Sequence, residues 1–237
     1  MRITAKENKT IPQAVILISA RAEWNAVVEF YENPAVESSP LGKHFQIPVS
    51  GINCLFFHGG WGKVAAATSA QYVIDRWQPQ LLVNLGTCGG FNGLVDVGEV
   101  ILANETVIYD IYERMGDPLA AFEHYSTHID LSYLGQPYPH AVRAGRLVSA
   151  DQDIDPAMVQ TLSVDFSAVA ADWESGAIAW TAARNDTKVL ILRAVSDLVG
   201  AGGGELYDQG DFQLRAREVM LPLLRALPAW LNCAFEK

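Results

Sequence analysis

The feature that most constrains the fold is a repeated alternation of short apolar runs with longer helical patterns. AVILISA (14–20) precedes the helical pattern EWNAVVEFY (23–31), and CLFFHGG (54–60) precedes the alanine-rich KVAAATSAQYVIDRW (63–77), after which PQLLVNLG (79–86) returns to strand. This order is β-α-β-α-β. The apolar runs are continuous, which indicates strands that are covered on both faces. The sequence therefore predicts an α/β sandwich.

The second half of the chain continues the same pattern. With 237 residues, 50% of them hydrophobic, the chain can bury one large core, so we expect a single domain over residues 1–237. The stretch 110–140 has weak periodicity and many aromatic residues, and we expect a long excursion that could cover a site. Further strands are predicted at 99–109, 141–150, 167–172 and 188–197, and further helices at 174–184 and 212–231.

Charge and cysteine content narrow the possible partners. The chain has 17 Lys and Arg residues against 27 Asp and Glu residues, a formal net charge of −10, which argues against a nucleic-acid partner. The three cysteines form no Cys-x-x-Cys pair, so reduced thiols are a simpler interpretation than disulfides or zinc ligands. Residues 1–13 are polar where a signal peptide is apolar, and no run reaches the roughly 18 apolar residues of a membrane span. We expect a cytoplasmic protein with no membrane partner.

Chemistry-bearing side chains follow several of the predicted strands. In open α/β sheets, ligands bind outside the carboxyl ends of the strands. Glu23 follows the first strand, Asp172 and Glu174 lie at the end of a later one, and Asp197 ends the last. These carboxylates could converge on one site.

The stretch LLVNLGTCGGF (81–91) interrupts an apolar run with Thr-Cys-Gly-Gly, which predicts a turn. Glycine at 86, 89 and 90 would let backbone N–H groups approach a ligand, and Thr87 adds a hydroxyl. Glycine in such turns can equally have a purely steric reason. The spacing matches neither the dinucleotide-binding nor the triphosphate-binding loop, so neither ligand is indicated.

Five blocks of sequence resemble one enzyme superfamily in their order and approximate spacing, over about residues 14–232. The chain resembles the nucleoside phosphorylases and nucleosidases, and most closely the 5′-methylthioadenosine/S-adenosylhomocysteine nucleosidases. The resemblance implies a three-layer α/β/α sandwich around a central mixed, twisted sheet, a homodimer, a small purine nucleoside as ligand, and no cofactor or metal. The blocks are GGWGKVAAA (59–67), VNLGTCGG (83–90), VDVGEVIL (95–102), ADWESGAIA (171–179) and RAVSD (193–197).

The resemblance assigns two of the tasks that N-glycosidic cleavage requires. A purine leaves ribose readily only when it is protonated, and the ribosyl centre becomes cationic as the bond stretches. The family's acid for purine N7 corresponds to Asp197, and its ligand for the ribose 2′- and 3′-hydroxyls corresponds to Glu174. On sequence alone, Asp197 could instead cap a following helix, and Glu174 could complement a helix dipole. Asp172 is expected to be structural, because adjacent strand residues point to opposite faces.

The nucleophile separates hydrolysis from phosphorolysis. The water-activating glutamate of the nucleosidases corresponds to Glu23, if one residue is absent from the turn; the alternative is a solvated residue at a helix start. Hexameric phosphorylases place a phosphate-binding arginine before the glycine turn, where this chain has Asn84, as the nucleosidases do. Arg21 argues for a phosphorylase instead, because some phosphorylases use an arginine in this loop. A purine nucleosidase is favoured, and a nucleoside phosphorylase or a non-catalytic nucleoside-binding relative are the alternatives.

The resemblance also implies residues around the ribose and the 5′ group. Thr87, Cys88 and Gly89 should line the ribose and water side of the site. Trp173 stands where the nucleosidases commonly have methionine, so a larger, flatter surface would lie near the ribose. Trp61 replaces a smaller apolar residue near the 5′ group, so bulky 5′-thio substituents should be disfavoured.

Base recognition is implied for a second group of residues. Asp153 and Ile154 should lie beside the purine, and Asp153 stands where the family often has an aromatic residue. A polar group there could select a base other than adenine or accept its amino hydrogens. Tyr207 or Phe212 could close over the base or the 5′ substituent, although an aromatic at a helix start is more often part of the core.

Overall fold

The computed structural model describes residues 11–200, 203–204 and 212–236. The strands are β1 (Ala14–Ile18), β2 (Glu37–Ser39), β3 (Gly42–Val49), β4 (Ile52–His58), β5 (Leu81–Phe91), β6 (Val100–Ile108), β7 (Ser126–His128), β8 (Arg143–Ser149), β9 (Ala168–Asp172), β10 (Val189–Gly200) and β11 (Gly203–Gly204). The helices are α1 (Arg21–Phe30), α2 (Lys63–Trp77), α3 (Pro118–His124), α4 (Ser175–Arg184) and α5 (Phe212–Phe235), with short turns η1 (Pro156–Met158) and η2 (Thr161–Asp165).

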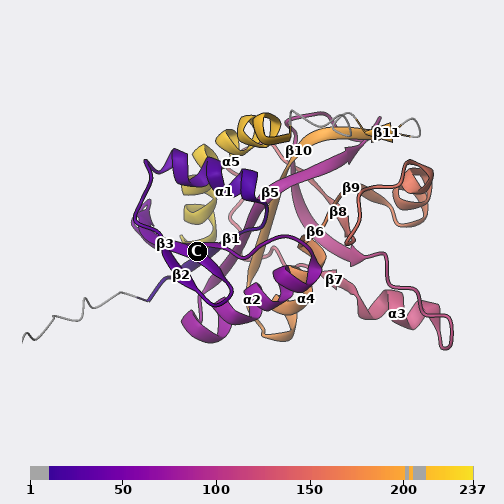
Figure 1. Ribbon diagram of the computed structural model, residues 1–237, viewed down its shortest axis with the longest axis horizontal. Coiled ribbons are helices and arrows are strands. Elements are labelled where there is room, and N and C mark those ends of the chain that lie inside the picture. The colour runs from indigo at the N-terminus through magenta and orange to yellow at the C-terminus, as the bar shows by residue number, and fades with distance from the viewer. Residues whose placement is uncertain (1–10, 201–202, 205–211, 237) are drawn as a thin grey trace, which may run out of the picture.

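The strands form one mixed sheet with helices on both faces. Their order is β11-β10-β6-β8-β9-β5-β1-β4-β3-β2, and β7 pairs with β6. Alternate residues of β1 enter two separate cores: Ala14 and Ile16 pack in the core that contains α1 and α5, and Val15 and Leu17 in the core that contains α2 and α4. Figure 1 shows the same two helix pairs on opposite sides of the strands. The predicted three-layer α/β/α fold around a mixed sheet is confirmed.

Strand β10 closes part of the sheet into a ring. It pairs with β6 on one side and with β5 on the other, and the pairs β6–β8, β8–β9 and β9–β5 complete the circle. In this arrangement Gly89 of β5 lies opposite both Asp197 of β10 and Ala171 of β9. The closure therefore brings three chemistry-bearing segments together, although they are far apart in sequence.

The predicted turn at Thr87–Gly90 is wrong, because β5 continues to Phe91. Its pairing with β10 runs on to Val199 opposite Phe91, across a bulge at Ser196. Gly86, Gly89 and Gly90 are absent from the glycines with positive φ, so no turn geometry requires them. The interpretation of Asp197 as a helix cap is also wrong, since Asp197 lies inside β10 rather than at its end.

Most of the other predicted elements are present, with shifted ends. Helix α2 spans the predicted residues 63–77, whereas α5 continues beyond residue 231 to Phe235. The hairpin β2–β3 was not predicted; at its turn, Gly42 lies so close to β4 that an added Cβ would sit 2.1 Å from the His58 carbonyl oxygen. None of the described helices, the long α5 included, has the length and apolarity needed to cross a membrane.

Candidate active site

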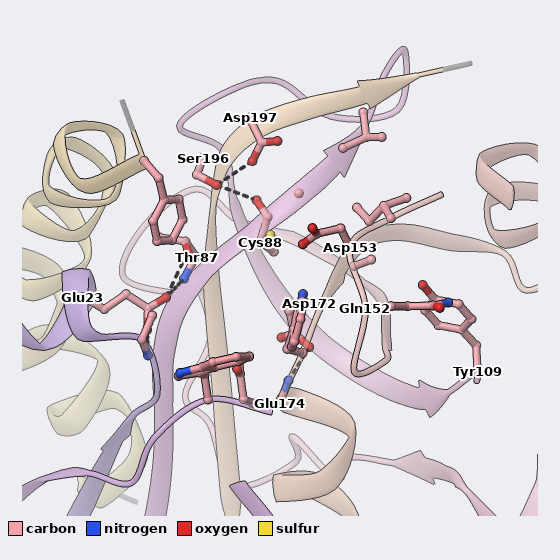
Figure 2. Close-up of a pocket in the computed structure, with 18 residues that line it drawn as sticks. Glu23, Thr87, Cys88, Tyr109, Gln152, Asp153, Asp172, Glu174, Ser196 and Asp197 are labelled. Atoms are coloured by element: carbon pink, nitrogen blue, oxygen red, sulfur yellow. Dashed lines mark hydrogen bonds between the residues drawn. The ribbon is translucent and has the colours of Figure 1, made fainter. Parts of the chain in front are cut away.

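A cavity of about 410 Å³ lies where β5, β9 and β10 meet (Figure 2). Ten predicted residues line it: Glu23, Trp61, Thr87, Cys88, Gly89, Asp153, Ile154, Trp173, Glu174 and Asp197. Phe212 at the start of α5 also lines it, whereas Tyr207 lies outside the described residues. The sequence therefore identified residues that the fold gathers around one cavity, with side chains that converge from separate elements.

The segment 110–140 does not contribute to the wall. Only Tyr109, which precedes it, lines the cavity. Leu134 instead packs in the core beside α5, and the Tyr133 hydroxyl donates a hydrogen bond to the Val189 carbonyl at 2.9 Å. The expectation that this excursion covers the site is therefore not met within the described chain.

Glu23 occupies the third position of α1 and is 2% exposed. The alternative of a solvated helix-start residue is therefore wrong. One carboxylate oxygen accepts hydrogen bonds from the backbone N–H of Thr87 at 2.6 Å and from its hydroxyl at 2.9 Å, as Figure 2 shows. The other oxygen accepts from the N–H of Ala20 at 3.0 Å. These bonds fix the carboxylate between the start of α1 and strand β5.

Glu174 is the N-cap residue of α4 and is buried, but its side chain does not cap that helix. One oxygen accepts from the backbone N–H of Gly62 at 3.1 Å, and the other accepts from Arg193 Nη2 at 3.2 Å. Burial raises the pKa of Glu174 to about 7; the neighbouring Asp172 and Glu23 also raise it, and Arg193 opposes the rise. The carboxylate is thus held in place and gains and loses its proton near neutral pH.

Arg193 is the main residue that the sequence analysis missed. It is 0% exposed and lies beneath the cavity, with its guanidinium between three carboxylates. Nε lies 2.9 Å from Asp172 Oδ2, Nη2 lies 3.2 Å from Glu174 Oε2, and Nη1 lies 3.8 Å from Glu23 Oε1. A signal was present in the sequence: an arginine within the apolar run VLILRAV of a covered strand requires buried acidic partners.

Asp172 has the structural role expected of it, although it also lies on the cavity wall. One oxygen accepts from the Ser149 hydroxyl at 2.6 Å and from the Ser175 N–H at 3.1 Å. The other accepts from the Ser175 hydroxyl and forms an ion pair with Arg193, whose Nε lies 2.9 Å away. Asp172 therefore ties β8, the start of α4 and Arg193 together.

Asn84 does not mark a strand end, because it lies in the interior of β5 and is fully buried. Its amide N–H donates to the Leu17 carbonyl at 3.2 Å, and its oxygen lies 3.2 Å from the Ser175 hydroxyl oxygen. These contacts hold the buried amide between β1 and α4. Asn84 contacts residues next to the site and does not itself line the cavity.

The glycines of β5 make room for the site. A Cβ added to Gly86 would lie 1.9 Å from Arg193 Nη1 and 2.8 Å from Glu23 Oε1. A Cβ added to Gly89 would lie 2.8 Å from Ile154 Cδ1 and 4.0 Å from Asp197 Oδ1. Glycine therefore allows close approach of side chains, because a Cβ would displace the charged groups at Gly86 and Ile154 at Gly89.

Asp197 and Ser196 lie at the bulge of β10, on the opposite side of the cavity from Glu174 (Figure 2). The Ser196 hydroxyl oxygen lies 2.7 Å from Asp197 Oδ1 and 3.2 Å from the Cys88 carbonyl oxygen. A hydroxyl has one proton, so when Ser196 donates to Cys88, a protonated Asp197 can donate to Ser196. This chain of groups can hold a proton on Asp197.

The other lining groups are acidic, neutral or aromatic. Burial raises the pKa of the Cys88 thiol well above its ordinary value, so Cys88 is an uncharged wall residue. Trp61 and Trp173 touch in a T-shaped pair, with centroids 5.3 Å apart. No lysine, arginine or histidine lines the cavity among the described residues. Nor does that part of the chain hold a cluster of His, Cys, Asp or Glu that is arranged for a metal ion.

Comparisons with known proteins agree on one family. The sequence model of the phosphorylase superfamily matches residues 14–227. The 5′-methylthioadenosine/S-adenosylhomocysteine nucleosidase of Geobacillus sp. (strain WCH70) is 27% identical over 173 residues, which cover 68% of this chain and 75% of the relative. That of Maridesulfovibrio salexigens is 24% identical over 221 residues, 88% of this chain and 96% of the relative. The crystal structure of the Streptococcus pneumoniae MTA/SAH nucleosidase with 8-aminoadenine superposes with a TM-score of 0.76 at 19% identity, covering 93% of this chain and 99% of that one. The chain belongs to the phosphorylase superfamily.

Proposed function

We propose that this protein is a purine nucleosidase that hydrolyses the N-glycosidic bond of an adenosine-type nucleoside, with Asp197, Glu174 and Glu23 as its catalytic residues. The observation that supports it best is that these three carboxylates, from three separate elements, line one cavity that carries no cationic side chain among its described residues. The curated relatives named above carry the name of nucleosidases for 5′-thio nucleosides, which extends the proposal to a 5′-thio-substituted substrate.

In the proposed reaction the bond between ribose C1′ and the purine N9 breaks, and a bond from C1′ to the oxygen of water forms. Asp197 donates its proton to purine N7, so the base leaves as a neutral molecule. Its hydrogen-bond chain through Ser196 to the Cys88 carbonyl supplies a position for that proton before the transfer. Ile154 and Asp153 would lie beside the base, because Ile154 packs against Gly89, opposite Asp197.

Glu174 would bind the ribose. Its carboxylate can accept hydrogen bonds from two adjacent hydroxyls, and charge-assisted bonds of this kind are stronger than neutral ones. The Gly62 N–H and Arg193 hold its two oxygens in place, so little reorganisation is needed when the sugar binds. Ionised Glu174 would also stabilise the positive charge that develops on the sugar.

Glu23 would take the proton from the attacking water. Hydrolysis requires such a carboxylate, whereas phosphorolysis requires cationic and N–H donors around a phosphate dianion. The nearby guanidinium of Arg193 lies behind Glu23, Asp172 and Glu174, which pair with its charge, and its N–H groups already donate to Ser175, Thr87 and Glu174. This arrangement favours water over phosphate. Arg21 does not line the cavity, so it supplies no phosphate contact there.

The product identifies the reaction. Nucleoside should be converted to free base and free ribose derivative in phosphate-free buffer, and Glu23→Gln should abolish this conversion while leaving nucleoside affinity largely intact, because Glu23 acts on water. Ribose 1-phosphate as the main product would establish a phosphorylase instead. Binding without release of base, in either buffer, would establish a non-catalytic nucleoside-binding protein.

The proposal includes a cytoplasmic homodimer. The three cysteines, Cys54, Cys88 and Cys233, are free thiols, in keeping with a reducing compartment. Exposed apolar side chains at Ile111, Tyr112, Met115 and Leu119 gather on one segment, and a subunit interface would cover them. Sedimentation equilibrium of the full chain tests the dimer, and a monomer at micromolar concentration would refute it.

A further inference from the structure

The cavity mouth carries an aromatic corner that the proposed reaction does not use. The rings of Trp61 and Trp173 lie 5.3 Å apart between centroids, with their planes at 64°, and both line the cavity. Trp61 is 65% exposed, so most of its indole surface is available to a bound molecule. Two steeply inclined indoles form a corner whose walls include aromatic ring faces, and indole faces carry negative electrostatic potential.

The position of Trp61 is fixed by its backbone neighbours. The Ser69 hydroxyl donates to the Gly59 carbonyl at 3.0 Å, and the Gly62 N–H donates to Glu174 at 3.1 Å. Gly60 and Gly62 on either side of Trp61 have positive φ values of 86° and 88°, which favour glycine. The exposed indole is therefore held beside the proposed ribose ligand, Glu174, which places it where a substituent on the sugar would lie.

The charges around this corner are also negative. Among the described residues, the Asp, Glu, Lys, Arg and His side chains on the cavity wall are all acids: Glu23, Asp153, Asp172, Glu174 and Asp197. A wall of acids repels an anionic substituent and attracts a cationic one.

Lys63, a cation two positions after Trp61 in the sequence, is already paired. Lys63 Nζ contacts Asp110 and lies 3.8 Å from Asp151 Oδ2, while the Lys63 backbone N–H donates to Asp151 at 2.6 Å. Two carboxylates therefore offset the single lysine charge. Its presence does not make the mouth of the cavity attractive to an anion.

We propose that the site selects a purine nucleoside whose C5′ substituent carries a positive charge, a sulfonium or alkylammonium group, and that Trp61 and Trp173 bind this group in their aromatic corner. The inference rests on the proposed nucleosidase function and names its substrate class more closely. A trimethylated or dimethylated onium group has an apolar surface as well as a charge, so it matches both the indole faces and the acidic surroundings. A neutral thioether gains only the apolar contact.

The test compares two nucleosides of nearly equal shape that differ in charge. 5′-Deoxy-5′-(dimethylsulfonio)adenosine carries S⁺(CH₃)₂ at C5′, and 5′-deoxy-5′-isopropyladenosine carries the neutral CH(CH₃)₂ group. Release of adenine gives kcat/KM for each, and calorimetry gives each Kd. We expect the cationic nucleoside to be favoured roughly fivefold to thirtyfold in both quantities, the range that cation–π contacts at a partly desolvated site produce.

Variants then assign the preference to the aromatic corner. Trp61→Leu should lower the ratio between the two nucleosides severalfold, to what Trp173 and the acidic wall still supply, and Trp61→Phe should lower it less, because a phenyl ring retains a negative face. Val64→Ala is the matched control, since Val64 is exposed on α2 and does not line the cavity. Its ratio should equal that of the wild type.

The outcomes separate this inference from the proposed function. Equal kcat/KM and Kd values for the two nucleosides would overturn the inference and leave the nucleosidase proposal standing. If neither nucleoside is cleaved, the proposed function fails, and the ratio of the two Kd values still decides the inference. A ratio that Trp61→Leu leaves unchanged would also overturn the assignment to the aromatic corner.

Discussion

Replacing Glu174 with glutamine tests whether a buried carboxylate destabilises the fold at the pH at which the site would work. Burial raises the pKa of Glu174 from its ordinary 4.5 to about 7. Between these two values the folded protein keeps a proton that the unfolded chain releases. The free energy of unfolding of the wild type therefore falls as the pH rises from about 4.5 to about 7. A pKa difference of this size corresponds to about 3 kcal/mol.

Glutamine keeps the shape of the side chain and does not titrate. Its carbonyl oxygen can still accept a hydrogen bond from the Gly62 N–H, while the charge that Arg193 faces is lost. Changes in packing or in neutral hydrogen bonds add a similar offset at every pH. The informative quantity is therefore the change of ΔΔG with pH: relative to wild type, Glu174→Gln should gain about 2–3 kcal/mol between pH 5 and pH 8.

The assay is urea unfolding at both pH values, with the free energy obtained by linear extrapolation and with equal m-values as the test of comparable transitions. Glu123→Gln, on the exposed face of α3, is the matched control. Its free energy of unfolding relative to wild type should be the same at both pH values. Parallel curves for wild type and Glu174→Gln across this range would show that the carboxylate is not held in a desolvated position, and the reasoning would be refuted.

Further changes test the other parts of the site. The kcat/KM of the wild type should rise with pH through about 7 as Glu174 loses its proton, because only the carboxylate can accept from both ribose hydroxyls, and a flat profile would contradict this. Asp197→Asn should lower kcat by about 10²–10⁴-fold with an unchanged unfolding midpoint, and near-normal turnover would remove Asp197 as the acid. Arg193→Met should lower the free energy of unfolding by about 3–5 kcal/mol at pH 8 and by less at pH 5, which lies below the raised pKa of its partner Glu174; equal losses at both would refute the charge argument. Gly86→Ala should lower turnover sharply, because its Cβ would lie 1.9 Å from Arg193, while Gly116→Ala, whose Cβ would meet only the flexible Glu113 side chain at 3.4 Å or more, should not.

The helices and the covered strands could be predicted because their information is local. The alanine-rich pattern of α2 gave both ends of that helix, since one apolar face repeats through the whole element. The continuous apolar runs of β1 and β4 indicated strands with helices on both faces. The ends of β5 and β10 could not be obtained in this way. Both strands continue through glycine or polar residues, because pairing with a distant strand decides their length.

The site shows the same limit. Glu174 and Asp197 could be named because the family resemblance carries each of them in a short block of sequence. Glu23 was named from its place after the first strand, with one residue absent from the turn. That they share one cavity depends on the closure of β10 onto β5, which no local pattern encodes. Asn84 shows the converse error: a polar residue in an apolar run was interpreted through its neighbours along the chain, whereas its partners are Leu17 and Ser175 on other elements.

Arg193 connects the stability of the fold to the geometry of the proposed reaction. It contacts the groups that would bind ribose and activate water, Glu174 and Glu23, and thereby sets their spacing. Gly86 lets the guanidinium reach that position, which explains a glycine inside a paired strand better than a turn does. A misplacement of about 1 Å in such an arrangement can reduce turnover by about 10²-fold. The contacts that hold β5, α4 and β10 together around Arg193 therefore also orient Glu23 and Glu174, the two carboxylates that we propose to act on the water and the sugar.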